Sequence, residues 1–148
     1  MFQGETSITI DDKGRMAIPI AFREAVAHAC GNRLVVTYHP YERGSLWLYP
    51  QTEWERVREQ VNRLSVAVAS HRLLQMKLVG AATFVEPDGN ARILLPATHR
   101  NATGIDRKAV LMGMGNKIEL WSEQAHLELI QKTIAEADVS EAMLDMVL

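Results

Sequence analysis

Cysteine, aromatic residues and long apolar runs are all scarce in this chain of 148 residues. A single cysteine excludes an internal disulfide and a cysteine cage for a metal ion, so packing alone must hold the fold. The five histidines lack the close spacing of metal ligands, and we expect neither a metal nor a cofactor. No segment approaches the roughly 18 apolar residues of a membrane span, and the first residues lack the pattern of a secretory signal. A cytoplasmic protein that contacts no membrane is therefore expected.

An excess of basic residues is also missing, since the formal net charge is −2. This balance argues mildly against a nucleic-acid partner, because proteins that bind phosphates usually carry a basic excess. The average hides a gradient, however: four acidic residues crowd the C-terminal end, and no Lys or Arg follows Lys132. The rest of the chain is close to neutral. With 47% apolar and 23% charged residues, the composition is typical of one folded globular body.

The sequence contains an internal repeat. When DDKGRMAIPIAFR is laid over DGNARILLPATHR, four identities fall in register: Asp11 with Asp88, Arg15 with Arg92, Pro19 with Pro96, and Arg23 with Arg100. The later LWLY and IELW segments also correspond, each followed by a helical pattern. The chain is therefore interpreted as two copies of one module.

Periodicity predicts similar elements in both copies. In the first copy, residues 7–10 and 16–18 form a predicted β-hairpin around the turn at 11–14. A helix follows Pro19 and closes at Gly31 and Asn32, and strands follow at 34–36 and 46–49. Thr52 and Glu55 form a capping-box pattern at the start of a further helix.

The second copy is predicted to contain strands at 110–114 and 117–120. Ser122 should cap a helix whose buried stripe is Leu127, Ile130 and Ile134. The domain organisation follows, with a first module at 1–64, a connecting helix at 65–80, and a second module with a C-terminal helix and acidic tail at 81–148. The apolar residues of that tail are expected to pack on the body or on a neighbouring molecule.

The predicted fold class is α+β. Each module is too small to be stable alone, so the two should share one core with pseudo-twofold symmetry. Such symmetry would bring both Asp-x-x-x-Arg turns to one face of the molecule.

Two interpretations of these charged turns remain open. In the first, the Asp side chain orders the turn, Gly14 supplies a positive φ, and an Asp–Arg pair is purely structural. Lys13 and Gly14 are replaced by Asn90 and Ala91 in the second copy, so neither is expected to be required in both turns. In the second interpretation, the repeated arginines bind phosphate or the edge of guanine with their forked donors.

Five segments together resemble the MraZ family of bacterial transcriptional regulators: MFQG, IDDKGRMAIP, LWLYPQTEWE, DGNARILLP and MGMGNKIELW. The resemblance runs in order from Met1 to about Trp121. It implies two tandem AbrB-like swapped-hairpin modules of βαββ type, with helical extensions. It further implies a nucleoid-associated repressor of the division and cell wall gene cluster that contains its own gene. Such a regulator reads short direct repeats in double-stranded promoter DNA as a ring-like homo-oligomer, without a small-molecule substrate.

Carried over by residue, the resemblance makes Lys13, Arg15 and Arg92 the DNA contacts and Asp11, Gly14 and Asp88 the residues that order the turns. Weaker candidates for DNA contact are Arg23, Arg72 and Arg100. The chain departs from the family pattern at two places. Ala91 stands where a glycine usually precedes the second arginine, and the connecting helix carries fewer arginines than is usual.

Two alternatives belong to other functional classes. One is an antitoxin-like module that binds a protein partner, although a second full module occupies the place where antitoxins usually have a disordered arm. The other is an enzyme in which Asp12, Asp88 and His99 form an acid–base set. No nucleophile motif, phosphate loop or metal spacing accompanies those residues, so the sequence does not favour catalysis.

Overall fold

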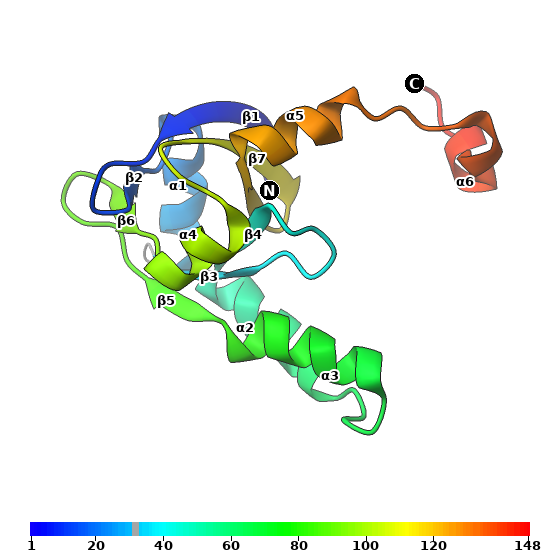
Figure 1. The fold of residues 1–148 in the computed structure, drawn as a ribbon, viewed down its shortest axis with the longest axis horizontal. Coiled ribbons are helices and arrows are strands. Elements are labelled where there is room, and N and C mark those ends of the chain that lie inside the picture. Colours follow the sequence, from blue (N-terminus) through cyan, green and yellow to red (C-terminus); the bar gives the residue numbers. More distant parts are fainter. Residues whose placement is uncertain (31–32) are drawn as a thin grey trace.

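A computed structural model describes residues 1–30 and 33–148, and the same series of elements occurs in it twice (Figure 1). The first series is β1 (Phe2–Thr9), β2 (Arg15–Ala17), α1 (Ile20–Cys30), β3 (Leu34–Tyr38), β4 (Ser45–Pro50) and α2 (Gln51–Asn62). The second is β5 (Thr83–Val85), β6 (Arg92–Leu94), α4 (Ala97–Thr103), β7 (Lys108–Gly115), β8 (Ile118–Ser122) and α5 (Glu123–Gln131). Helix α3 (Ala69–Gln75) and the π-helix η1 (Met76–Gly80) connect them. A 3₁₀ turn η2 (Glu136–Asp138) and helix α6 (Glu141–Leu144) follow.

The strands of the two series are interlaced. Six of them form an antiparallel sheet in the order β1-β7-β8-β4-β3-β5, and β2 pairs with β6 in a separate two-stranded sheet. Read from either edge, the large sheet gives the same succession of corresponding strands. The two series are therefore related by a pseudo-twofold axis, in an α+β fold.

The strand register places that axis. In the small sheet Met16 pairs with its counterpart Ile93, and in the large sheet Trp47 pairs with its counterpart Glu119. Neighbouring pairs are exchanged symmetrically about these two positions. The axis therefore passes through the middle of β2–β6 and of β4–β8.

The prediction of a β-hairpin within the first copy is wrong in its pairing. The strands form close to where they are predicted, but β1 pairs with β7 and β2 pairs with β6. The two arms meet beside the turn, where Ile10 bridges Met16 and the backbone N–H of Asp11 donates to the carbonyl of Arg15 at 2.9 Å. Alternation of polar and apolar residues specifies which face of a strand is buried, and it leaves the partner strand undetermined.

The core occupies both faces of the large sheet. Alternate residues of β3 show this, because Leu34 and Val36 pack into one cluster with Phe22 of α1, whereas Val35 packs into another. The second cluster contains Trp54 of α2 and Leu78 of η1, among other residues. Helices thus cover both sides of β3, which is buried along most of its length.

Of the two predicted side-chain caps at helix N-termini, one is formed and the other is not. Helix α2 begins at Gln51 with Pro50 as its N-cap and no side-chain cap, so the capping box predicted at Thr52 is not formed. The fixed φ of Pro50 ends β4 and starts the helix directly. Ser122 caps α5 as predicted, since its hydroxyl accepts a hydrogen bond from the backbone N–H of Ala125. The predicted end of α1 at Gly31 and Asn32 lies outside the described residues.

The predicted buried stripe of α5 is wrong. Leu127, Ile130 and Ile134 are all exposed, and Ile134 lies beyond the end of the helix at Gln131. Helix α5 rests on β7 and β8 near its start, and the chain then leaves the body (Figure 1). Leu144, Met146, Val147 and Leu148 of the acidic tail are exposed, and Met143 is half-buried. The four exposed side chains do not pack on the body, which was one of the two expected arrangements.

Candidate nucleic-acid interface

The two charged turns have the same hydrogen-bond pattern. In the first turn, Asp11 Oδ1 accepts from the backbone N–H groups of Lys13 and Arg15, both at 2.9 Å. Its Oδ2 accepts from Arg15 Nε at 2.8 Å. The second turn repeats all three bonds, from the backbone of Asn90 at 2.8 Å, the backbone of Arg92 at 3.0 Å and Arg92 Nε at 3.2 Å to the Asp88 carboxylate. The expected turn-ordering by aspartate is therefore present in both copies.

The hydrogen bonds of the turns lower the pKa of both aspartates. The backbone N–H of Arg15 is the largest influence that lowers the pKa of Asp11, and the backbone N–H of Arg92 does the same for the pKa of Asp88. A carboxylate that accepts several N–H bonds is stabilised in its charged form. Each turn thus holds its arginine through a charge-assisted bond at neutral pH.

The structural and the ligand-binding interpretations of the Asp–Arg pair are compatible. Each pair uses only Nε of the arginine, and the Arg15 and Arg92 side chains are both 34% exposed. Within the described part of the chain, no hydrogen bond engages the terminal Nη groups of either arginine. The aspartate fixes the direction of a fork whose outer donors remain available.

Residues 14 and 91 require a left-handed backbone in both turns. The φ angle is 86° at Gly14 and 57° at Ala91. The left-handed geometry is thus common to both turns although glycine is not, and glycine itself is not required in both copies, as expected. Alanine adopts the left-handed region at a cost, since its Cβ approaches the following carbonyl, and the three hydrogen bonds to Asp88 support it there.

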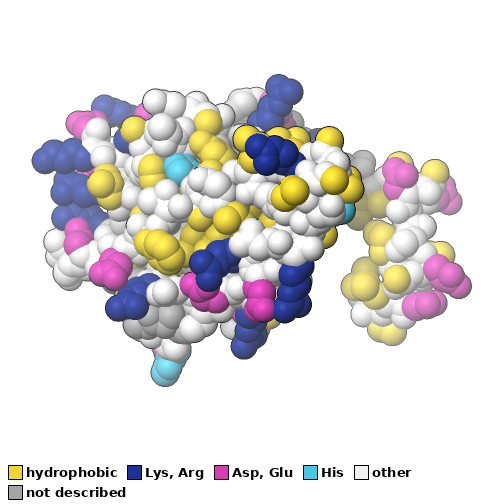
Figure 2. Space-filling model, turned by 90° about the horizontal axis from the view of Figure 1, so that it is seen from below, with side chains coloured by type: hydrophobic (Ala, Val, Ile, Leu, Met, Phe, Trp, Pro, Cys, Tyr) yellow, Lys and Arg dark blue, Asp and Glu magenta, His cyan; other side chains and the backbone are white. Residues whose placement is uncertain are grey.

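The small sheet brings the two turns to one end of the molecule, as the pseudo-twofold symmetry predicts (Figure 1). Each turn is also bonded to the other repeat. Ile18 N–H donates to the carbonyl of Ala91 at 2.8 Å, and Leu95 N–H donates to the carbonyl of Gly14 at 2.9 Å. Figure 2 shows Lys and Arg side chains gathered at this end, opposite the C-terminal end of the chain. The two turns therefore form one rigid surface.

Arg23 and Arg100 lie beside this surface, each next to the turn of the other repeat. Arg23 Nε donates to the carbonyl of Ile18 at 2.7 Å, and Arg100 Nε donates to that of Leu95 at 3.2 Å. A Cβ added at Gly14 would lie 2.7 Å from the Arg100 guanidinium carbon. Arg23 lines a surface hollow with Asp88, Gly89 and Ala91.

The other two candidates for DNA contact, Lys13 and Arg72, lie at different distances from the turns. The Lys13 side chain is exposed at the tip of the first turn, whereas Arg72 lies on α3, away from the turns. Arg107 was not predicted, yet it joins the surface by bonding Asp12 at 2.9 Å. Its position depends on the pairing of β1 with β7, which the sequence pattern does not specify.

The residues of the enzyme alternative have separate partners. Asp12 pairs with Arg107, Asp88 orders its turn, and His99 is buried with Nε2 2.7 Å from the carbonyl of Ala81. In residues 1–30 and 33–148, no three His, Cys, Asp or Glu side chains gather as ligands for a metal ion. Nor does any helix in that part of the chain have the length and apolar character to cross a membrane.

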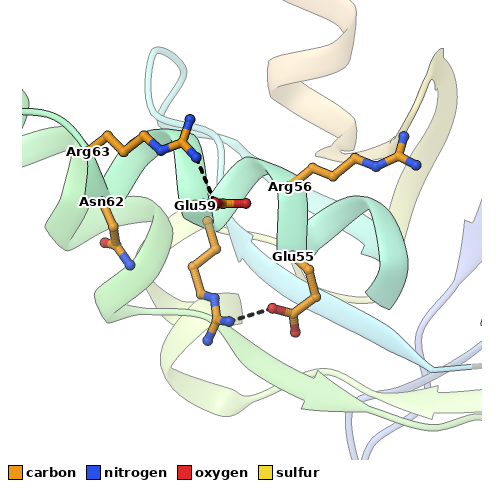
Figure 3. Close-up of a pocket in the computed structure, with 6 residues that line it drawn as sticks. Glu55, Arg56, Glu59, Asn62 and Arg63 are labelled. Atoms are coloured by element: carbon orange, nitrogen blue, oxygen red, sulfur yellow. Dashed lines mark hydrogen bonds and ion pairs between the residues drawn. The ribbon is translucent and has the colours of Figure 1, made fainter.

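A hollow of about 430 Å³ lies along α2 (Figure 3), which is away from the turns next to β2 and β6 (Figure 1). It is lined by Glu55, Arg56, Arg58, Glu59, Asn62 and Arg63. Arg63 pairs with Glu59 at 2.7 Å, and Arg58 pairs with Glu55. These are ion pairs within one helix, typical of an exposed helix surface.

Comparison with known proteins identifies relatives of the whole chain. A family model described as "MraZ protein, putative antitoxin-like" matches residues 1–77 and again 78–148. The chain is 59% identical over 146 residues to the transcriptional regulator MraZ of Stenotrophomonas maltophilia and 57% identical to that of Xanthomonas campestris, with 99% of each chain covered. It is 46% identical over 125 residues to that of Saccharophagus degradans, with 84% of each chain covered. The chain therefore belongs to the MraZ family.

Proposed function

We propose that this chain is a sequence-specific DNA-binding transcriptional regulator whose DNA contacts are the two Asp-x-x-x-Arg turns. The observation that carries the proposal is the pair of arginines on one rigid surface, each held through Nε with its outer donors available. Lys13, Arg15 and Arg92 contact phosphates or purine edges, and Arg23 and Arg100 flank them. Asp11, Gly14 and Asp88 hold the turns in the binding geometry.

The relatives named above are transcriptional regulators, which supports a regulatory role, and the finer parts of the proposal follow the family resemblance of the sequence. In this proposal the chain represses the division and cell wall gene cluster that contains its own gene, and acts in the cytoplasm on the nucleoid. Its fold is a pair of AbrB-like swapped-hairpin modules, divided at residues 64 and 80. The interlacing of the strands between the two series is consistent with such modules.

Self-association is part of the proposed mechanism. Few basic groups per chain face the DNA and the net charge is −2, so one chain binds weakly. Several chains in a ring-like homo-oligomer would engage spaced direct repeats together, and the effective concentration of each further contact raises the affinity.

The test is a fluorescence-anisotropy titration with DNA from upstream of the chain's own gene. We expect Arg15→Ala and Arg92→Ala each to weaken binding about 10- to 100-fold, the range for the loss of a specific arginine contact. Arg56→Ala on α2 is the matched control, with an exposed arginine removed elsewhere, and should bind like the unmodified chain. Affinities equal to the control for both turn variants would refute the proposal. A protein partner captured without DNA binding would instead favour the antitoxin-like alternative, which the family description supports.

A further inference from the structure

The last residues form an exposed arm. After α5 ends at Gln131, residues 132–148, here called the C-terminal arm, contain only η2 and the four-residue α6. Ile134 is 66% exposed and Leu144 is 73% exposed. Figures 1 and 2 show the arm standing apart from the body. Five of its large apolar side chains thus stay exposed to solvent: Ile134, Leu144, Met146, Val147 and Leu148.

The charge of the arm is of one sign beyond Lys132. After Lys132 it carries Glu136, Asp138, Glu141 and Asp145, and no Lys or Arg. No ion pair within the described residues engages any of these carboxylates. In Figure 2 the arm displays hydrophobic and acidic side chains without a basic one. A surface that covers it should therefore be apolar and basic.

Helix α3 and Met76, the first residue of η1, present such a surface. Ala69, Arg72, Leu73 and Met76 follow one another at i, i+3, i+4 and i+7, which places them on one side of the helix, and all four are exposed. We call them the α3 stripe. Leu73 and Met76 are each 56% exposed, although an apolar stripe normally faces a core. The opposite side of the helix, with Leu74 and Gln75, is the one turned to the body.

The charge around the α3 stripe complements that of the arm. Residues 64–80 contain Arg72 and Lys77 and no Asp or Glu. Within the described residues, neither of these cations has an ion-pair partner. The arginines of α2 differ, because the glutamates of their own helix already pair with them (Figure 3). The free positive charge of this region therefore lies on α3 and η1.

The arm does not cover the α3 stripe of its own chain. Figure 1 shows α3 projecting from one side of the body while the arm leaves α5 at another. We propose that the C-terminal arm of one copy docks on the α3 stripe of a second copy. The contact buries Ile134 and Leu144 against Leu73 and Met76, and it places the acidic residues of the arm near Arg72 and Lys77.

This contact joins two different surfaces, so it is heterologous. Each copy keeps a free stripe and a free arm, and successive copies close into a ring if the rotation between them allows. The inference rests on the self-association proposed above and names the surfaces that carry it. It is independent of whether the turns bind DNA.

The test measures the mass of the full chain in solution, without DNA, by light scattering after gel filtration. An arm variant carries Ile134→Ser, Leu144→Ser and Met146→Ser, and a stripe variant carries Leu73→Ser and Met76→Ser. Ile20→Ser is the control, because Ile20 is also exposed and lies on neither surface. We expect the unmodified chain and the control to form oligomers, and each variant alone to run as a 16.6 kDa monomer with unchanged circular dichroism.

Mixing the arm variant with the stripe variant tests whether the arm of one copy contacts the α3 stripe of another, rather than some other surface. The arm variant keeps an intact stripe and the stripe variant keeps an intact arm, so an equimolar mixture should form one contact and stop at a dimer. Variants that retain the oligomeric mass would overturn the inference, and so would monomeric variants that fail to pair when mixed. A monomeric unmodified chain would also overturn it, leaving a different protein as the occupant of the arm. Because DNA is absent, failure here is distinct from failure of the DNA-binding proposal.

Discussion

At the scale of single residues, the charged turns show how much a short motif can predict. The spacing Asp-x-x-x-Arg, repeated at 11–15 and 88–92, predicts an aspartate that accepts turn N–H groups, and both turns have this arrangement. The motif does not predict the backbone of Ala91. Glycine signals a positive φ by its identity, whereas alanine in the same conformation carries no such signal.

Adding a Cβ at residue 14 and removing the Cβ at residue 91 should change the free energy of unfolding in opposite directions. Gly14→Ala forces a Cβ into the left-handed region and against the Arg100 guanidinium, and it should cost about 1 kcal/mol of unfolding free energy or more. Ala91→Gly relieves the corresponding strain and should stabilise by about 0.5–1 kcal/mol.

Urea denaturation of the unmodified chain and of the Gly14→Ala and Ala91→Gly variants measures both changes in unfolding free energy. Gly89→Ala is the control, because a Cβ there meets no atom within 4 Å and no positive φ is involved. A Gly14→Ala variant as stable as this control would contradict the strain assigned to the first turn.

At the scale of elements, local patterns predict the strands and most helices, and they fail where a partner decides the outcome. The apolar residues 127, 130 and 134 have helical spacing, but more than half of the surface of each is exposed. The spacing indicates an apolar face and leaves open which molecule buries it. Likewise, the π-helix η1 interrupts the predicted connecting helix, and the partner of its carbonyls lies outside residues 65–80.

That partner is Thr37 of β3. It is fully buried, and its hydroxyl lies 2.9 Å from the carbonyl oxygen of Lys77 and 2.6 Å from that of Leu78. Thr37→Val keeps the volume but leaves buried carbonyls of η1 without this donor, and it should cost about 1–2 kcal/mol. Thermal or urea unfolding measures the loss.

The exposed Thr9→Val serves as the control for the loss of a hydroxyl from a strand. If the Thr37→Val and Thr9→Val variants were equally stable, the hydrogen bonds from Thr37 to η1 would contribute nothing to the free energy of unfolding.

At the scale of the whole molecule, the internal repeat predicts two copies around one core and both turns at one end. The interlacing of strands between the copies does not follow from periodicity, because each strand pattern is compatible with a partner from either copy. The cross-repeat positions of Arg23, Arg100 and Arg107 depend on that pairing. Their place beside the turns is therefore visible only in the assembled fold.

The central claim is that the paired turns form a DNA-binding surface. Its most direct test is the salt dependence of DNA affinity, because each phosphate contact releases a bound counterion and contributes about 0.9 to the slope of log K against log salt. The chain and its Arg15→Ala/Arg92→Ala variant should be titrated with the same promoter DNA at several salt concentrations, with the oligomeric mass confirmed for both. If the arginines contact phosphate or base edges, the variant should bind far more weakly, and the slope should fall by up to about two for each chain bound. An unchanged affinity and an unchanged slope would contradict the account and leave the turns a purely structural role.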